Sequence, residues 1–176
     1  MHFSSLATLA VAAAPLAVSA AGTLGFALGD KKTDGTCKYQ ADYEADFSAI
    51  QTNSGSTLVR IYAASDCNTA QQLLPAAKSK GFKVILGVWP DTEASLEADK
   101  KALQTYVPQY KDQVYAVTVG SETLYRGNFT GSQLLEKIND VKSILPNGIK
   151  VGTADSWNKY ADGTADAVIK GGVDIL

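Results

Sequence analysis

The sequence has 176 residues, a formal net charge of −2 and a hydrophobic fraction of 45%, which suffices for an ordered core. It contains no Lys/Arg cluster of the kind that follows a phosphate backbone, so we expect no nucleic-acid partner. His2 is the only histidine and there are two cysteines. Without His2, the composition excludes Ser-His-Asp and Cys-His triads and imidazole or thiolate zinc sites, so we expect no metal and no cofactor.

The first 20 residues predict a secretory signal peptide. Leu6–Val18 is an apolar run that is too short to span a bilayer, for which about 20 residues are needed. The small residues around Ser19 suit cleavage after Ala20. A buried helix is the alternative interpretation. Cleavage would leave a secreted chain without histidine and without a membrane span.

The two cysteines, Cys37 and Cys67, are candidates for one disulfide bond in a secreted chain. Closing a loop of this length would stabilise the fold by roughly 3–4 kcal/mol in the chain-entropy model. Two free thiols, or pairing with cysteines outside this sequence, are the alternatives.

From residue 23 onward, strand-like and helix-like segments alternate. The expected strands are Thr23–Leu28, Leu58–Ala63, Lys83–Trp89, Val114–Gly120, Ile149–Thr153 and Val173–Leu176. The expected helices are Tyr43–Gln51 with Asp42 as N-cap, Asn68–Lys80, Glu93–Tyr110, Ser132–Leu145 with Thr130 as cap, and Asn158–Lys170, which is interrupted by Gly163.

Apolar strands that alternate with helices predict an α/β fold with a parallel sheet, either open and doubly wound or closed into a barrel. Neither a glycine-rich phosphate loop nor a Walker A motif is present, which favours a (β/α)8 TIM barrel. A complete barrel takes about 250 residues. We therefore expect residues 21–176 to be the N-terminal portion of a single barrel domain, with five βα units and the start of a sixth strand.

In such barrels the active site lies at the carboxyl ends of the strands, and here those ends carry carboxylates and aromatic rings. Such residues suit a sugar substrate, because rings stack on sugar faces and acids act on the glycosidic oxygen. The expected rim residues are Arg60, Tyr62, Asp66, Trp89, Asp91, Ser121, Glu122, Tyr125, Arg126, Asn128, Asp155 and Trp157. Of these, Asp66 and Asp91 are better interpreted as loop and cap residues than as catalysts.

Glu122 is the candidate proton donor, since it directly follows the apolar run that ends at Gly120. We expect partial desolvation there, which favours the neutral, proton-donating form of a carboxyl group. The alternative is a structural salt bridge to Arg126 or Lys137.

Several segments resemble the fungal cell-wall branch of glycoside hydrolase family 17, whose members are β-1,3-glucanases and β-1,3-glucanosyltransferases. The segments that carry the resemblance are TLGFALGDKKTDGTCK, LVRIYAASDCNT, GFKVILGVWPD, VTVGSETLYRGNFT, KINDVKSILP and KVGTADSWN. The resemblance implies a (β/α)8 barrel and a retaining mechanism with two glutamates.

The resemblance implies that Glu122 is the acid/base glutamate. Ser121 stands where much of the family has Asn in contact with the sugar 2-hydroxyl, and Tyr62 matches a residue that lines the sugar site. The nucleophile of the family lies in a Gly-Glu-Thr-Gly-Trp-Pro motif that this sequence does not contain. We therefore expect the 176-residue chain alone to be inactive, and a non-catalytic glucan-binding or wall-associated protein is the alternative function.

Asp155 and Trp157 are expected to contact substrate, and Tyr125 and Trp157 to favour a sugar acceptor over water. Asn128 begins an Asn-Phe-Thr glycosylation sequon. The expected partner is β-1,3-glucan, the expected location extracellular or in the fungal cell wall, and the expected state monomeric. An unrelated glycosidase of the same barrel type, acting on β-1,4-linked substrates, remains a third interpretation.

Overall fold

Five parallel strands form a single sheet in the order β1-β2-β3-β4-β5 in the computed structural model, which describes residues 22–176. The predicted signal peptide, with His2, lies outside the described residues. The strands are β1 (Phe26–Ala27), β2 (Leu58–Arg60), β3 (Lys83–Val88), β4 (Val114–Ser121) and β5 (Lys150–Ala154). The α-helices are α1 (Gln40–Ser54), α2 (Thr69–Lys80), α3 (Glu93–Tyr106), α4 (Gly131–Ser143), α5 (Trp157–Ala161) and α6 (Asp166–Lys170). Two short 3-10 helices are η1 (Asp66–Asn68) and η2 (Val107–Tyr110).

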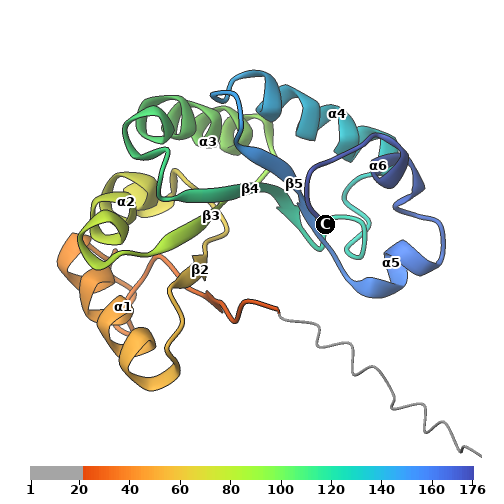
Figure 1. Ribbon diagram of the computed structural model, residues 1–176. Coiled ribbons are helices and arrows are strands. Elements are labelled where there is room, and N and C mark those ends of the chain that lie inside the picture. Colours follow the sequence, from red (N-terminus) through yellow and green to blue (C-terminus); the bar gives the residue numbers. More distant parts are fainter. Residues whose placement is uncertain (1–21) are drawn as a thin grey trace, which may run out of the picture.

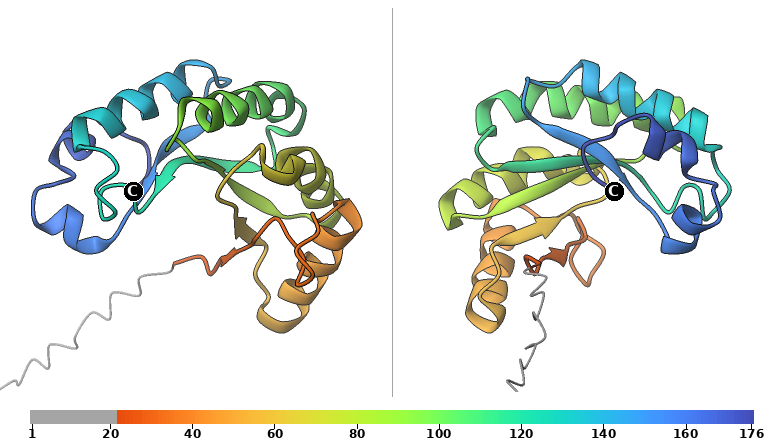
Figure 2. Two further views of the ribbon diagram at one scale, coloured as in Figure 1. Left: turned by 180° about the vertical axis from the view of Figure 1, so that it is seen from behind. Right: turned by 45° about the vertical axis from the view of Figure 1, so that its right-hand side comes forward.

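The sheet curves, with helices α1 to α4 along its convex side and the carboxyl-terminal segment near its concave side (Figure 1). Two further views show the same arrangement of an inner arc of strands and an outer arc of helices (Figure 2). Each strand pairs in parallel with its neighbour in sequence. This order requires a helix-containing crossover after each strand, which is the repeating βα unit predicted from the alternation.

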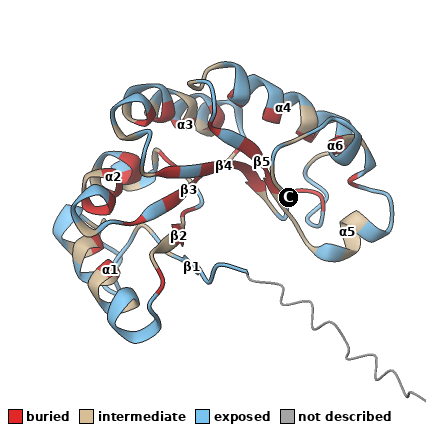
Figure 3. Cartoon of the chain, in the orientation of Figure 1, coloured by how far each residue is buried: buried red, intermediate tan, exposed pale blue. Residues whose placement is uncertain are grey.

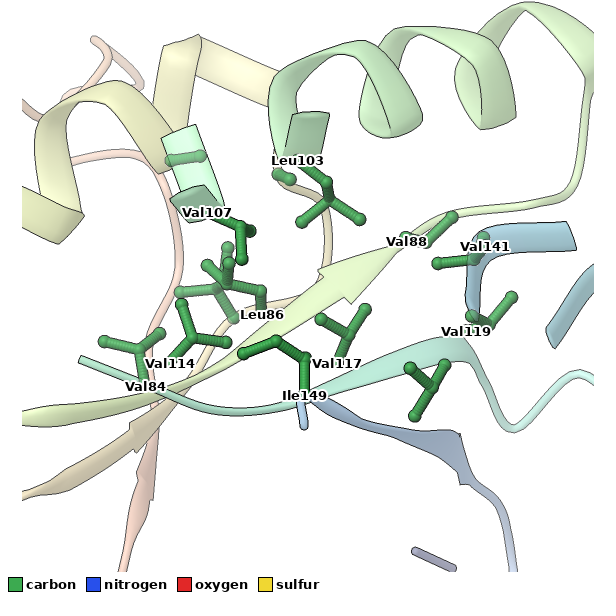
Figure 4. Close-up of a cluster of buried hydrophobic side chains, with 14 of the residues drawn as sticks. Val84, Leu86, Val88, Leu103, Val107, Val114, Val117, Val119, Val141 and Ile149 are labelled. Carbon is green, nitrogen blue, oxygen red and sulfur yellow. The ribbon is translucent and has the colours of Figure 1, made fainter. Parts of the chain in front are cut away.

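The core lies between the sheet and the helices of the convex side. Buried residues run along the strands and along the helix faces that are turned toward them (Figure 3). Val84, Leu86 and Val88 occupy every second position of β3 and cluster with Leu103 and Val107 (Figure 4). Burial of each such side chain contributes about 1.5–3 kcal/mol, so this layer is what holds the sheet curved around its open side.

Most predicted helices and strands are present, and their ends differ for identifiable reasons. Helix α1 begins before Asp42, which is not the N-cap: its Oδ2 accepts from the backbone N–H of the cap residue Tyr39 at 2.8 Å. Helix α3 gives way to η2 at Val107, because the following Pro108 has no N–H to donate. Thr130 caps α4 as predicted, with its Oγ1 accepting from the N–H of Gln133.

Three predicted elements are wrong in extent. Of Thr23–Leu28 only Phe26 and Ala27 form a strand, and the Leu28 N–H adds one further hydrogen bond to the Arg60 carbonyl oxygen at 2.8 Å. The predicted strand Leu58–Ala63 is also shorter, since β2 ends at Arg60. The predicted interruption of Asn158–Lys170 at Gly163 is confirmed: α5 and α6 are separate, and the Gly163 φ of +87° is left-handed. Val173–Leu176 is not a strand, although Ile175 forms a single parallel bridge with Gly152 of β5. Among residues 22–176, no helix is both long and apolar enough to cross a membrane.

Candidate active site

Five of the expected rim residues line one cavity of about 320 Å³ at the carboxyl ends of β2, β4 and β5. The lining residues are Arg60, Tyr62, Ser121, Glu122, Ala154 and Asp155. They come from segments far apart in sequence and meet because the carboxyl ends of parallel strands lie at the same edge of a sheet.

An irregularity at the end of β4 places Glu122 in this cavity. The β4–β5 register shifts between Thr118 and Ser121, as in a β-bulge, and Gly120 there has a φ of +82°. A β-carbon at Gly120 would lie 2.7 Å from the Thr123 side chain, so this turn requires glycine. Glu122 itself has a φ of +55°, and its N–H donates to the carbonyl oxygen of Ala154 at 2.9 Å. Glu122 thus ends the sheet pairing in a conformation that non-glycine residues rarely adopt.

The Glu122 carboxylate is exposed, contrary to the partial desolvation that we expected, because no described segment covers this end of β4. The predicted alternative, a salt bridge to Arg126 or Lys137, is also wrong. Arg126 instead pairs with Asp91 at 2.9 Å, and the Lys137 Nζ lies 5.2 Å from the centre of the Phe129 ring. Within residues 22–176 the Glu122 carboxylate has no ion-pair partner, so it is free to meet a ligand.

Asp155, directly after β5, faces the backbone of the same turn. Its Oδ2 accepts from the N–H of Leu124 at 2.8 Å, and its Oδ1 accepts from the N–H groups of Tyr125 at 3.1 Å and Ser156 at 2.8 Å. Both carboxylate oxygens are therefore occupied by backbone donors. Its predicted contact with substrate stays a prediction.

Arg60 and Tyr62 form the wall that β2 contributes. The Arg60 guanidinium lies 5.0 Å from the centre of the Tyr62 ring. Burial lowers the pKa of Arg60, and the electrostatic effects of Tyr62, Tyr160 and Glu122 oppose this shift. Arginine nevertheless stays charged at physiological pH, which places a fixed positive charge near Glu122.

Gly87 of β3 allows the chain at Tyr62 to pass close by. A β-carbon at Gly87 would lie 2.3 Å from the carbonyl oxygen of Tyr62, a contact that the backbone cannot relieve. Tyr62 also lines a second cavity of about 230 Å³ beside Trp89. The rim therefore continues from Glu122 past Tyr62 toward the end of β3.

A buried carboxylate that binds the backbone of Trp89 was not singled out from the sequence. Asp99 of α3 is fully buried and accepts from the Ser65 N–H, the Ser65 hydroxyl and the Trp89 N–H at 2.6–2.7 Å. Burial raises the pKa of Asp99, and the hydrogen bonds from Ser65 and Trp89 counteract this shift. Its position on the buried face of α3, among apolar residues, was the only sequence signal that could have identified it.

Asp91 anchors the far end of the loop after β4. It binds the Arg126 guanidinium, which also donates to the Ser121 carbonyl oxygen at 3.1 Å and lies 4.8 Å from the centre of the Trp89 ring. The Asn128 side-chain amide donates to Asp91 at 2.8 Å. Asp91 is thus a structural loop residue, in line with its interpretation from the sequence, and Asn128 is exposed but hydrogen-bonded.

Two predicted aromatic contacts lie outside the cavity. Tyr125 is 57% exposed and Trp157 is 78% exposed, and neither is among the lining residues. Both flank the Glu122 turn, Tyr125 in the turn itself and Trp157 at the start of α5. Most of each aromatic side chain is open to solvent.

Cys37 and Cys67 are joined by a disulfide with an S–S distance of 2.05 Å and a Cα–Cα distance of 5.3 Å. The bond ties the segment after β1 to the loop after β2. In residues 22–176, no group of three or more His, Cys, Asp or Glu side chains is arranged as a metal site.

Residues 25–176 match the BtgE/BtgC glycoside hydrolase domain. The chain belongs to this family. Its fold is similar to the crystal structure of a glycoside hydrolase family 17 β-1,3-glucanosyltransferase from Rhizomucor miehei, with a TM-score of 0.73 and 30% identity over 85% of this chain and 54% of that one. The predicted family 17 membership and the (β/α)8 barrel class, represented here by part of the barrel wall, are confirmed.

Two curated relatives of this family member carry the name glucan 1,3-β-glucosidase. The protein from Arthroderma benhamiae is 60% identical over all of this chain and 56% of its own length. The protein from Saccharomyces cerevisiae is 47% identical over 97% of this chain and 58% of its own length. The chain therefore spans somewhat more than half the length of these relatives.

Proposed function

We propose that this chain is the acid/base half of a retaining glycoside hydrolase that acts on β-1,3-glucan, with Glu122 as proton donor. The observation that carries the proposal is the free Glu122 carboxylate at the carboxyl end of β4, in a cavity with Tyr62 and Ser121. The glucan 1,3-β-glucosidase relatives and the glucanosyltransferase structure supply the substrate class.

The chemistry follows from the two-carboxylate mechanism. Protonated Glu122 gives its proton to the glycosidic oxygen while the bond from that oxygen to the anomeric carbon breaks, and a second carboxylate about 5 Å away takes the anomeric carbon. Ionised Glu122 then removes a proton from water or from a sugar hydroxyl, which displaces the second carboxylate. Asp155 is the other carboxylate in the described cavity, but its oxygens face backbone N–H groups. The nucleophile must therefore come from residues that this sequence does not contain.

Water and sugar compete in the second step, and exposed rings beside the cavity favour sugar. Tyr125 and Trp157 present such rings next to the Glu122 turn. A sugar that stacks on them would be held near the anomeric carbon, whereas water gains nothing from the rings. We therefore propose that transfer to a glucan acceptor accompanies hydrolysis.

The remaining proposals concern context. Residues 1–20 act as a signal peptide, residues 21–176 form the N-terminal portion of one barrel domain, and the protein works as a monomer outside the cell or in the cell wall. Support comes from the Leu6–Val18 segment and from the fungal relatives. Glycosylation of Asn128 is proposed as well, since the residue is exposed.

The test compares Glu122→Gln with Glu136→Gln, an exposed glutamate on α4 away from the cavity. The assay uses the longest polypeptide that the gene encodes, beside the 176-residue chain, on laminarin and on a dinitrophenyl β-laminaribioside. Loss of the proton donor should cost about 100-fold or more on laminarin. The first-step release of dinitrophenol, seen as a burst, should change little, because this leaving group needs no proton, whereas the later turnover slows without the base. Glu136→Gln should match the wild type.

Three outcomes distinguish the alternatives. Near-normal laminarin turnover by Glu122→Gln contradicts the acid/base role. Binding to insoluble β-1,3-glucan without turnover by any encoded polypeptide supports the non-catalytic, wall-associated alternative. Turnover of β-1,4-linked but not β-1,3-linked substrates supports an unrelated substrate class.

A further inference from the structure

We propose that Asp155 is a positioning residue that holds the turn after β4 and thereby fixes the left-handed backbone of Glu122. The inference depends on the proposed acid/base role of Glu122 for its effect on catalysis. It replaces the direct sugar contact that the sequence predicted for Asp155.

The hydrogen bonds of Asp155 are made to the backbone of the turn that follows Glu122. The carboxylate of Asp155 accepts from the N–H groups of Leu124 and Tyr125, the second and third residues after Glu122, at 2.8 and 3.1 Å. Hydrogen bonds to an ionised acceptor are roughly twice as strong as neutral ones. No other described residue accepts from these two N–H groups, so Asp155 alone satisfies them.

The left-handed backbone of Glu122 needs a restraint from neighbouring structure. A left-handed backbone costs a residue with a β-carbon about 1–2 kcal/mol and persists only where neighbouring structure imposes it. On its amino-terminal side, the Glu122 N–H donates a hydrogen bond to the carbonyl oxygen of Ala154 in β5. After Glu122, the restraint on the next amides comes from Asp155, also at the end of β5. Glu122 is therefore held on both sides by the end of β5: its own N–H is bonded to Ala154, and the N–H groups of Leu124 and Tyr125 are bonded to Asp155.

Asp91, which follows β3, contacts the same loop in a different way from Asp155. Asp91 binds side chains only, those of Arg126 and Asn128, four and six residues after Glu122. Long side chains transmit position less strictly than backbone amides do. Asp155 is therefore the carboxylate whose loss moves Glu122.

The experiment is Asp155→Asn, which keeps the side-chain shape but turns an amide N–H₂ toward backbone N–H donors. A misplacement of about 1 Å at a catalytic group can cost 10²-fold. In the longest polypeptide that the gene encodes, kcat on laminarin should therefore fall about 100-fold while KM changes little. Asp174→Asn is the matched control, because the Asp174 carboxylate also accepts a backbone N–H, that of Val151 at 2.9 Å, near the opposite end of β5. Asp174→Asn should leave kcat unchanged.

A spectroscopic readout is independent of turnover. In ¹H–¹⁵N spectra of the 176-residue chain, Asp155→Asn should shift the Leu124 and Tyr125 amide signals and speed their exchange with solvent. Asp174→Asn should shift Val151 and leave those two unchanged. Asp155→Glu, which keeps the charge but displaces the oxygens by one methylene, provides a second variant with a smaller loss of kcat.

The double variant Asp155→Asn/Glu122→Gln separates the two proposals. If Asp155 acts through Glu122, the double variant is no slower than Glu122→Gln alone. A rise in KM at constant kcat in Asp155→Asn overturns the inference in favour of direct sugar binding. Unchanged amide signals overturn it as well. Full activity of Glu122→Gln, with the amide shifts of Asp155→Asn still present, instead contradicts the proposed function and leaves the turn assignment standing.

Discussion

The loops after β2 and after β4 both border the candidate active site and both contain non-glycine residues with left-handed backbones, yet they are restrained by different means. In the β2 loop, Cys67 and Asn68 have φ values of +51° and +54°, and in the β4 loop Glu122 has +55°. The β2 loop is held by the Cys37–Cys67 disulfide and by buried Asp99. The β4 loop is held by the hydrogen bonds of Asp155 and Asp91.

The difference shows how a rim can combine a fixed wall with a reactive group. The Cys37–Cys67 disulfide and the buried Asp99 carboxylate are little affected by solvent, so they can hold the β2 loop next to Tyr62 in a fixed conformation. A turn held by charged hydrogen bonds leaves the Glu122 carboxylate in the open, where it can meet a sugar. Substitutions in each loop should therefore differ in their effect on stability and on local hydrogen exchange.

Removal of the disulfide in Cys37→Ser/Cys67→Ser should have the largest effect. The bond closes a loop with a sequence separation of 30, so its loss should lower the free energy of unfolding by about 3–4 kcal/mol. Urea denaturation measures the loss, and reduction of the wild type is the control. Hydrogen exchange should rise at Asp66–Thr69 and stay constant at Leu124 and Tyr125; equal loosening of both loops would refute their independence.

The variant Asp99→Asn should come next. One of the three donors that face Asp99 would meet an amide N–H₂ instead of an oxygen, and an unsatisfied buried donor costs about 1–3 kcal/mol. The same denaturation experiment measures this loss. Asp66→Asn, a change in the same loop at a less buried residue, is the control and should cost less. An equal cost for both variants would show that Asp99 does not fix the β2 loop.

The variant Glu122→Gly should have the smallest effect and the opposite sign. Glycine adopts a positive φ without a steric penalty, so the free energy of unfolding should rise by about 1 kcal/mol while the proton donor is lost. Glu122→Ala keeps the β-carbon and should bring no such gain. If Glu122→Ala stabilises as much as Glu122→Gly, the gain comes from removing the charge rather than from relief of backbone strain.

Much of the fold was predictable because the strands and helices here are local patterns. The apolar run at Val114–Gly120 and the cap at Thr130 gave β4 and the start of α4 within one residue. Predictions failed where a neighbour decided the outcome. The backbone of Val173–Leu176 meets that of β5 only through the Asp174 N–H, which donates to the Val151 carbonyl oxygen, and through the Ile175 bridge to Gly152, so it forms no strand. Thr23–Leu28 pairs with β2 as a strand over two residues only.

The residues of the candidate site were predictable from sequence, but their conformations and contacts were not. Its members Tyr62, Ser121, Glu122 and Asp155 were predicted, because the ends of apolar runs are visible in sequence. The pairing of Arg126 with Asp91 and the contacts of buried Asp99 join positions 10 to 35 residues apart in sequence. The exposure of Glu122 depends on the absence of a described segment over the end of β4.

The sequence by itself determined which residue stands at the end of β4: an apolar run followed by Gly-Ser-Glu places a carboxylate at the rim of a parallel sheet. Only the tertiary structure decided how that carboxylate is presented. Glu122 takes a left-handed backbone because the register of β4 shifts against β5, and the amides that follow it are captured by Asp155. The β4–β5 register and the hydrogen bonds from Leu124 and Tyr125 to Asp155 each require both strands, so the sequence of neither strand predicts them alone.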